Sequence, residues 1–352
     1  MMARPAVSVG AERMSRACAS HNDERPLRLA LLDEIRAVVG FEAYAWLLTD
    51  PETEVGVAPL ADAPCLAELP RLIRLKYSTT VNRWTHLGVP VGRLIDATGG
   101  HPERSLVWRE LLHSYDVSDI ASMVFRDGFG CWGFLDLWRY GSDAKFTEQE
   151  AEFLTGAAVS ITQALRRCQA NTFEQNGVDL VRAGPVVLVL SPDLEVRAQT
   201  PETEEYLRRL VPPDTDRPPV PAGAYNVAAQ LLAIESGVDD HQASARVHLA
   251  DGTWLTLRAG RIGGVAPPHE QDIAVTIEPT QPVERTSLFV RAHGLSSREA
   301  ELVTHLATGA DTRLVAERMF LSENTIQDQL KSIFAKTGIR NRRTLLARAA
   351  GR

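Results

Sequence analysis

The stretch LSENTIQDQLKSIFAKTGI, residues 321–339, decides how the C-terminal part of the chain folds. Ser322 stands just before a helical run, where its hydroxyl can accept a hydrogen bond from a free backbone N–H. Gly338 stands just past the end, where glycine enters the left-handed region without strain. The apolar residues have the spacing of one buried helix face: Ile326, Leu330, Ile333 and Phe334. The sequence therefore predicts one capped, amphipathic helix.

The polar side chains of this helix gather on its opposite face. They are Asn324, Gln327, Asp328 and Lys331, with Ser332 and Ala335 beside them. Amide, carboxylate and ammonium groups suit the edges of base pairs in a major groove. They suit plain solvent equally well, and solvent is the commoner case for an amphipathic helix taken alone. The neighbouring segments therefore have to decide between the two interpretations.

Two short helices are expected upstream of this stretch. In LSSREAELVTHLATG, residues 295–309, Ser296 and Glu299 have the spacing of a capping box. A second helix is expected at 311–319, followed by a tight turn. Two short helices, a tight turn and a polar-faced second helix make the helix-turn-helix arrangement, in which the second helix enters the major groove.

Charge favours DNA over solvent as the partner of the polar face. From Gly294 onward there are ten Lys/Arg against six Asp/Glu, in a chain of formal net charge −7. No acidic residue follows Asp328, whereas seven basic ones do. A basic tail on an acidic protein is the electrostatic pattern of phosphate binding.

Residues 294–350 resemble the four-helix DNA-binding domain of the LuxR family of bacterial transcription regulators, through LSSREAELV, LATGADTRLVAERMFLSENTI and KTGIRNRRTLLARA. The resemblance implies a third helix in the major groove of double-stranded DNA and pairing of two copies through the fourth. Carried over by position, it implies DNA contacts from Asn324, Thr325, Gln327, Asp328, Lys331, Arg342 and Arg343. It implies dimer contacts from Leu345, Leu346 and Ala349.

Two residues of the polar face depart from this simple picture. Gln329 stands where many relatives have His, on the flank of the polar face. Asp328 is an acid close to phosphates; it could accept from a cytosine amino group, or it could hold Lys331 in place.

The whole chain reads as an ordinary globular protein of two or three domains. It has 352 residues, of which 44% are hydrophobic and 24% charged, and no run approaches the roughly 20 apolar residues of a membrane span. Residues 1–25 lack a secretory signal and are expected to be disordered. The four cysteines, Cys18, Cys65, Cys131 and Cys168, are scattered, which indicates a reducing cytoplasm, no disulfide framework and no metal site.

Residues 26–170 hold five of the six tryptophans and read as a helix, antiparallel strands, a helical middle and a long closing helix. This α+β pattern resembles a GAF domain, most visibly where GCWGFLDLWR runs into FTEQEAEFL. The resemblance implies a ligand pocket between the sheet and the helices of residues 66–115, which Trp84, Trp108 and Tyr115 could line. The same three aromatics could equally be core, since large aromatics are buried mainly for packing.

Residues 184–279 begin with two strands and end with three, and Asp251-Gly252 between alternating strands predicts a hairpin with a type I′ turn. The pattern resembles a shortened, degenerate PAS domain, which implies a second sensor fold. No residue offers a handle for a cofactor, so a structural or dimerising role is the alternative. Residues 280–293 are expected to be a linker to the helix-turn-helix domain at 294–352.

The sequence thus predicts a multidomain α+β protein with two antiparallel-sheet, sensor-like domains followed by an all-α domain. Its expected function is that of a cytoplasmic, homodimeric, DNA-binding transcription regulator, controlled by a small molecule or a partner acting on the N-terminal domains. The alternatives are a ligand-independent regulator and a protein-interaction scaffold with degenerate sensor domains. No catalytic residue and no cofactor are expected, because no nucleophile elbow, phosphate-binding loop or paired His/carboxylate motif occurs.

Overall fold

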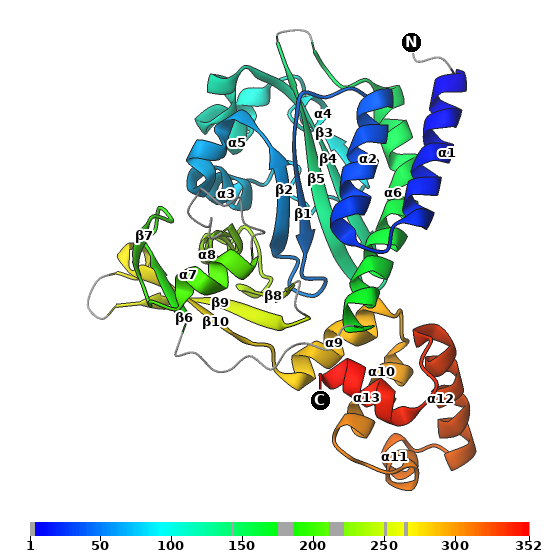
Figure 1. The fold of residues 1–352 in the computed structure, drawn as a ribbon. Helices are drawn as coiled ribbons and strands as arrows, with labels where there is room; N and C mark the ends of the chain where they lie inside the picture. Colours follow the sequence, from blue (N-terminus) through cyan, green and yellow to red (C-terminus); the bar gives the residue numbers. More distant parts are fainter. Residues whose placement is uncertain are drawn as a thin grey trace.

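The computed structural model describes residues 4–141, 144–174, 186–210, 222–249, 252–263 and 267–351. Figure 1 shows a first unit (residues 4–174) and a second unit (residues 186–279), each built on one sheet, and a C-terminal unit of helices (residues 282–351). The expected multidomain α+β class, with two antiparallel sheets and a helical C-terminal part, is confirmed.

The first unit is an antiparallel sheet with strand order β2-β1-β5-β4-β3 and helices on both faces. Figure 1 shows α1, α2 and α6 along one face and α3 and α5 on the other. The strands are β1 (Ala43–Thr49), β2 (Gly56–Asp62), β3 (Val91–Arg93), β4 (Val117–Asp127) and β5 (Gly130–Tyr140). The helices are α1 (Arg4–Ser20), α2 (Glu24–Val38), α3 (Leu69–Ser78), α4 (Leu94–Ala97), α5 (Leu106–Glu110) and α6 (Glu148–Asn171), with 3-10 turns η1 (Pro64–Glu68), η2 (Pro102–Arg104), η3 (Leu112–Tyr115) and η4 (Thr172–Glu174).

The expectation that residues 1–25 are disordered is wrong for most of that segment. α1 packs against α2 and α6, and its residues Met14, Ala17 and Cys18 are buried there. Their i, i+3, i+4 spacing places all three on one face of the helix. Three small or medium-sized buried residues make too narrow a stripe to predict a packed helix from the sequence. Their burial depends on α2 and α6, against which α1 packs.

The second unit is also an antiparallel sheet, with strand order β7-β6-β10-β9-β8. The expected hairpin is present as β8 and β9, paired from Ser244↔Arg258 to His248↔Trp254, whereas Asp251 of the predicted turn lies outside the described residues. The strands are β6 (Val186–Leu190), β7 (Val196–Gln199), β8 (Ser244–His248), β9 (Trp254–Ile262) and β10 (Asp272–Pro279). Its helices are α7 (Thr203–Leu210) and α8 (Ala222–Glu235), with the 3-10 turn η5 (Pro268–Glu270).

Helix α8 belongs to both sheet units. It packs against β8, β9 and β10 of its own sheet and against α3 and β2 of the first unit. Ala224, Val227 and Ala228 are fully buried, as expected for a helix that is apolar all round. The second unit and part of the first therefore share one hydrophobic core.

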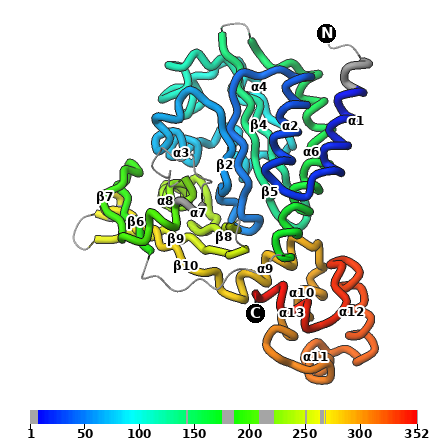
Figure 2. The backbone as a smooth tube through the Cα atoms, viewed as in Figure 1, coloured from blue at the N-terminus to red at the C-terminus, as the bar shows by residue number. Residues whose placement is uncertain are grey.

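The C-terminal unit begins with a helix where a linker was expected. Residues 282–292 form α9, which lies between the second unit and the other C-terminal helices along the chain (Figure 2). A capping box between Gln281 and Glu284 begins the helix. Leu288 and Phe289 of α9 are buried, and the helix packs against α6, α10 and α13. The remaining helices are α10 (Ser297–Ala307), α11 (Thr312–Met319), α12 (Glu323–Thr337) and α13 (Arg342–Ala350).

Candidate nucleic-acid interface and an apolar cavity

Helix α12 forms as the sequence predicts. The Ser322 hydroxyl accepts a hydrogen bond from the backbone N–H of Thr325 at 3.1 Å, and Gly338 ends the helix in the left-handed region with φ 68°. Ile326 and Ile333 are fully buried and Leu330 is nearly so. This burial fixes which face of the helix points outward.

The outward face of α12 carries the residues expected to contact DNA. Its exposed side chains are Asn324, Thr325, Gln327, Asp328 and Lys331. Figure 1 places α12 at the outer edge of the molecule, away from both sheet units. The face is therefore open to a large partner.

Asp328 contacts Lys331 on this face. Lys331 Nζ lies 2.9 Å from Asp328 Oδ1, and the two side chains are 77% and 75% exposed. A pair this exposed contributes little to stability and can open when a phosphate or a base edge approaches. Gln329, by contrast, is half-buried, and its amide oxygen is buried without a partner among the described residues. Gln329 therefore does not belong to the exposed face.

Glu299 of α10 anchors α12. Its carboxylate accepts from Lys336 Nζ at 2.6 Å, from Ser332 Oγ at 2.7 Å and from the Ser296 backbone N–H at 2.7 Å. Burial opposes ionisation, but these hydrogen bonds outweigh it and lower the pKa of Glu299 to about 2. The capping box of Ser296 and Glu299 was predicted. The bonds to Lys336 and Ser332 join residues more than 30 positions apart, and no local pattern reports them.

The two arginines expected on phosphates are placed differently. Arg343 is exposed, whereas Arg342 is half-buried and donates to the Ala310 carbonyl, joining α13 to the start of α11. The predicted dimer residues Leu345 and Ala349 are fully buried within this chain, where α13 packs against α9 and α10. Leu346 is half-buried.

The three aromatics expected in a ligand pocket form packing contacts in the first unit. Trp84 is 2% exposed, stacks on Phe134 with ring centroids 4.2 Å apart and donates to the Glu54 carbonyl. Trp108 donates to the Val117 carbonyl at 2.7 Å. Tyr115 donates to the Glu68 carboxylate at 2.7 Å. None of the three lines the cavity described next.

That cavity, of about 330 Å³, lies in the first unit between the sheet and the helices of the middle section. Its walls are mostly apolar, with side chains from β1, β5 and α3 such as Leu47, Phe134, Leu72 and Ile73. The polar side chains in the lining include Asn82, Trp138 and Asn226, together with the ion pair of Lys76 and Asp136. A cavity thus lies between the sheet and the middle helices, where the resemblance implies a ligand pocket, and its lining residues are other than the three aromatics named for it.

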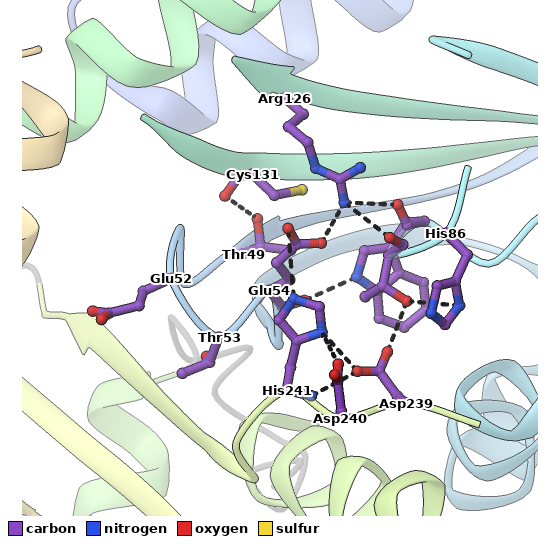
Figure 3. Close-up of polar contacts among 12 residues, drawn as sticks. Thr49, Glu52, Thr53, Glu54, His86, Arg126, Cys131, Asp239, Asp240 and His241 are labelled. Atoms are coloured by element: carbon purple, nitrogen blue, oxygen red, sulfur yellow. Dashed lines mark hydrogen bonds and ion pairs between the residues drawn. The ribbon is translucent and has the colours of Figure 1, made fainter. Parts of the chain in front are cut away.

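Near the cavity, a cluster of charges joins the first and second units (Figure 3). His241 Nδ1 lies 2.7 Å from Asp239 Oδ1, and its Nε2 lies 3.8 Å from Glu54 Oε1. The hydrogen bond to Asp239 raises the pKa of His241. Asp239 also accepts from Arg83 at 2.9 Å and from Thr85 at 2.7 Å. The ligand atoms of Asp239, Asp240 and His241 lie within 4.8 Å of one another, as the ligands of a metal ion would. Asp239, however, is already paired with Arg83.

Comparison with known proteins identifies the C-terminal unit. Residues 293–349 match the family described as "Bacterial regulatory proteins, luxR family". A stretch of 57 residues is 40% identical to the "Probable HTH-type transcriptional regulator GfsR" of Streptomyces halstedii, and it covers 16% of this chain and 24% of that protein. The chain therefore carries a LuxR-type helix-turn-helix domain, the kind of domain found in DNA-binding transcription regulators.

A solved structure titled "Sensor region of a sensor histidine kinase" aligns with 67% of this chain and 84% of its own, at 17% identity and a TM-score of 0.17. None of the helices in the part of the chain that the structure describes combines the length and the apolar character that a membrane span needs.

Proposed function

We propose that this protein is a transcription regulator that binds double-stranded DNA through the exposed face of α12. The observation that carries the proposal is that face itself: polar, open, fixed by the buried side of the helix, and part of a LuxR-type domain. Lys331 and Arg343 contact phosphates and set register and affinity. Asn324 and Gln327 present amide groups to base edges in the major groove.

In this proposal Asp328 has one role in the free protein and another on DNA. In the free protein its carboxylate holds Lys331, as the 2.9 Å contact indicates. On DNA the pair opens, Lys331 turns to a phosphate, and Asp328 accepts from the amino group of a cytosine. Thr325, near the start of the helix, and Arg342 lie close to the backbone of the duplex.

The protein acts in the cytoplasm as a homodimer that reads two half-sites about one helical turn apart. The half-buried Leu346 supplies the dimer contact of α13, because Leu345 and Ala349 are covered by α9 and α10. The first unit is a GAF-like sensor and the second a PAS-like one. A small molecule controls the protein by binding more tightly to one of two arrangements of these units, since equal affinity for both would shift nothing.

Selection from a random duplex library with the full-length protein tests DNA binding. We expect one sequence class to be enriched, and Lys331→Ala to weaken binding to it by about 1–3 kcal/mol and to lower the salt dependence by about one phosphate contact. Arg109→Ala is the control, because it removes the same charge from an exposed site in the first unit. Affinity unchanged by Lys331→Ala contradicts the orientation of α12, and a library without enrichment favours the scaffold alternative.

A further inference from the structure

We propose that the cavity of the first unit binds a small, uncharged, mostly apolar molecule with one hydrogen-bonding end, and that α8 of the second unit forms part of its wall. The inference rests on the proposed control by a small molecule and specifies the chemistry of that molecule and the element that reads it. At about 330 Å³, the cavity is within the size range of small-molecule sites, which are mostly apolar with a few placed polar groups.

Unmade hydrogen bonds define the polar end of the ligand. Trp138 is 2% exposed and Asn226 is 1% exposed, and both line the cavity. Trp138 Nε1 and Asn226 Oδ1 have no hydrogen-bond partner among the described residues, and the same holds for Asn82 Nδ2. Each buried, unsatisfied group costs about 1–3 kcal/mol. A ligand that offers a carbonyl oxygen to one of the donors, or an N–H or O–H to the Asn226 oxygen, reduces that cost.

The charges in the wall define the net charge of the ligand. Among the described residues that line the cavity, Lys76 and Asp136 are the charged ones, and their side chains lie 2.7 Å apart. Because each neutralises the other, neither is left to balance a charged ligand. A carboxylate or an ammonium group would be buried without a counter-ion, which is strongly unfavourable. The ligand is therefore uncharged.

Helix α8 brings the second unit into the wall. Ala222 and Asn226 of α8 line the cavity beside Tyr77 of α3. Asn226 Nδ2 donates to the Gly56 carbonyl at 2.9 Å, and the Gly56 N–H donates to the Tyr77 hydroxyl at 2.9 Å. These two bonds hold α8, β2 and α3 together at the edge of the cavity. A molecule that fills the cavity therefore touches both sheet units at once.

Displacement of a neutral fluorophore, N-phenyl-1-naphthylamine, from the full-length protein tests the ligand class. Decanamide offers a carbonyl and an N–H on an apolar chain, and decanoate is its charged match in length. We expect decanamide to displace the fluorophore at a concentration at least about tenfold below that of decanoate, a difference of 1.4 kcal/mol. Decanoate at equal or lower concentration, or no displacement by decanamide, overturns the assignment.

A variant that fills the cavity locates the binding. Ala45 lines the cavity from β1, so Ala45→Phe is expected to abolish fluorophore binding while the protein stays folded, as judged by its circular dichroism. Val159→Phe enlarges a side chain on the exposed face of α6 and is expected to change nothing. If Ala45→Phe does not fold, the smaller Ala45→Val replaces it. Fluorophore binding that survives in a folded Ala45 variant overturns the site.

Hydrogen exchange tests the part played by α8. Saturating decanamide is expected to slow amide exchange in α3 and also in α8, because both elements wall the cavity. Slower exchange in α3 alone overturns the shared wall. Neither measurement uses DNA, so a failure here leaves the DNA-binding proposal intact, and a failure to select a DNA sequence leaves the cavity assignment intact.

Discussion

His293 belongs to an aromatic cluster to which all three units contribute. Its ring lies 4.3 Å from that of Phe289 in α9 and 6.3 Å from that of Phe173, which follows α6. Phe173 in turn stacks on Trp254 of β9, with centroids 5.1 Å apart. Burial, together with the nearby charge of Arg348, lowers the pKa of His293 to about 4. The first unit, the second unit and the C-terminal unit thus all contribute to one aromatic cluster, and His293 within it stays neutral at pH 7.

We expect this histidine to make the protein less stable in mild acid. Between pH 6.5 and pH 4 the unfolded chain binds a proton at His293 and the folded chain does not. The free energy of unfolding therefore falls by about 1.4 kcal/mol for each unit by which the pH is lowered in this range. His293→Phe keeps the ring and cannot bind a proton. The difference between its thermal midpoint and that of the wild type should increase in favour of the variant as the pH is lowered from 7 to 5. A difference that stays constant over this range contradicts the prediction.

At the scale of the element, the packing of α12 against α10 depends on contacts such as those of Glu299. Its carboxylate caps α10 and also binds Lys336 and Ser332 of α12. We expect Glu299→Ala to lower the free energy of unfolding of the C-terminal unit by about 2–3 kcal/mol, because it removes a cap of α10 and the hydrogen bonds to the half-buried Ser332 and to Lys336. Glu301→Ala, on the same helix but paired only at the surface with Arg298, should change it by less than about 0.5 kcal/mol. Urea unfolding measures both; equal effects contradict the anchoring role.

Elements specified by neighbouring residues could be predicted from the sequence, and others could not. The capping boxes at Thr147 and Ser296 each span four residues, and β4 and β5 are apolar strands that follow one another and pair across a short turn, so local patterns indicate them. The sequence predicts a linker at 280–293 because Leu288 and Phe289, the large buried apolar residues of α9, make only a narrow stripe. Its helical state depends on α6, α10 and α13, which lie far away along the chain.

At the scale of the whole molecule, the sequence indicates a pocket between the sheet and the middle helices but does not indicate which residues line the cavity found there. Tyr77 and Asn226 both line it and stand about 150 residues apart. The many tryptophans of the first unit suggest Trp84 and Trp108 as lining residues, but Trp84 stacks on Phe134 in the core. Which polar groups face a cavity depends on how two units dock, and this information is spread over the whole sequence.

A route from the cavity to the DNA-binding helices follows from the same docking. β9 of the second unit contacts the start of α9, where Thr256 Oγ1 lies 3.3 Å from the Glu284 carboxylate and Arg258 pairs with it. Arg246 of β8 reaches the Glu284 carbonyl at 3.3 Å. α9 then packs onto α10 and α13. In the proposed control by a small molecule, a shift of α8 against its sheet reaches the C-terminal unit through these contacts.

The docking of the two sheet units depends on the buried ion pair of Arg246 with Asp50. Arg246 Nε lies 2.6 Å from Asp50 Oδ2, and the aspartate side chain is 0% exposed. Burial alone would raise the pKa of Asp50, but the hydrogen bond and charge of Arg246 hold it below its usual value. Arg246→Leu leaves this carboxylate without its partner, which should cost about 3–5 kcal/mol of unfolding free energy.

A double variant separates the pair from its surroundings. In Asp50→Asn with Arg246→Leu both charges are gone, and the Asn oxygen still accepts from the backbone N–H of Glu52 and Thr53, as the aspartate does at 3.0 and 3.2 Å. The amide nitrogen of the Asn replaces the oxygen that accepts from the backbone N–H of residue 246 at 2.9 Å, so that one hydrogen bond is lost. We expect the double variant to recover part of the stability lost in Arg246→Leu, because the uncompensated buried charge is gone, as measured by urea unfolding and by amide exchange in α8 and β8. If the double variant is no more stable than Arg246→Leu, the loss comes from the arginine's own packing. The two units would then be held by the shared hydrophobic core around α8.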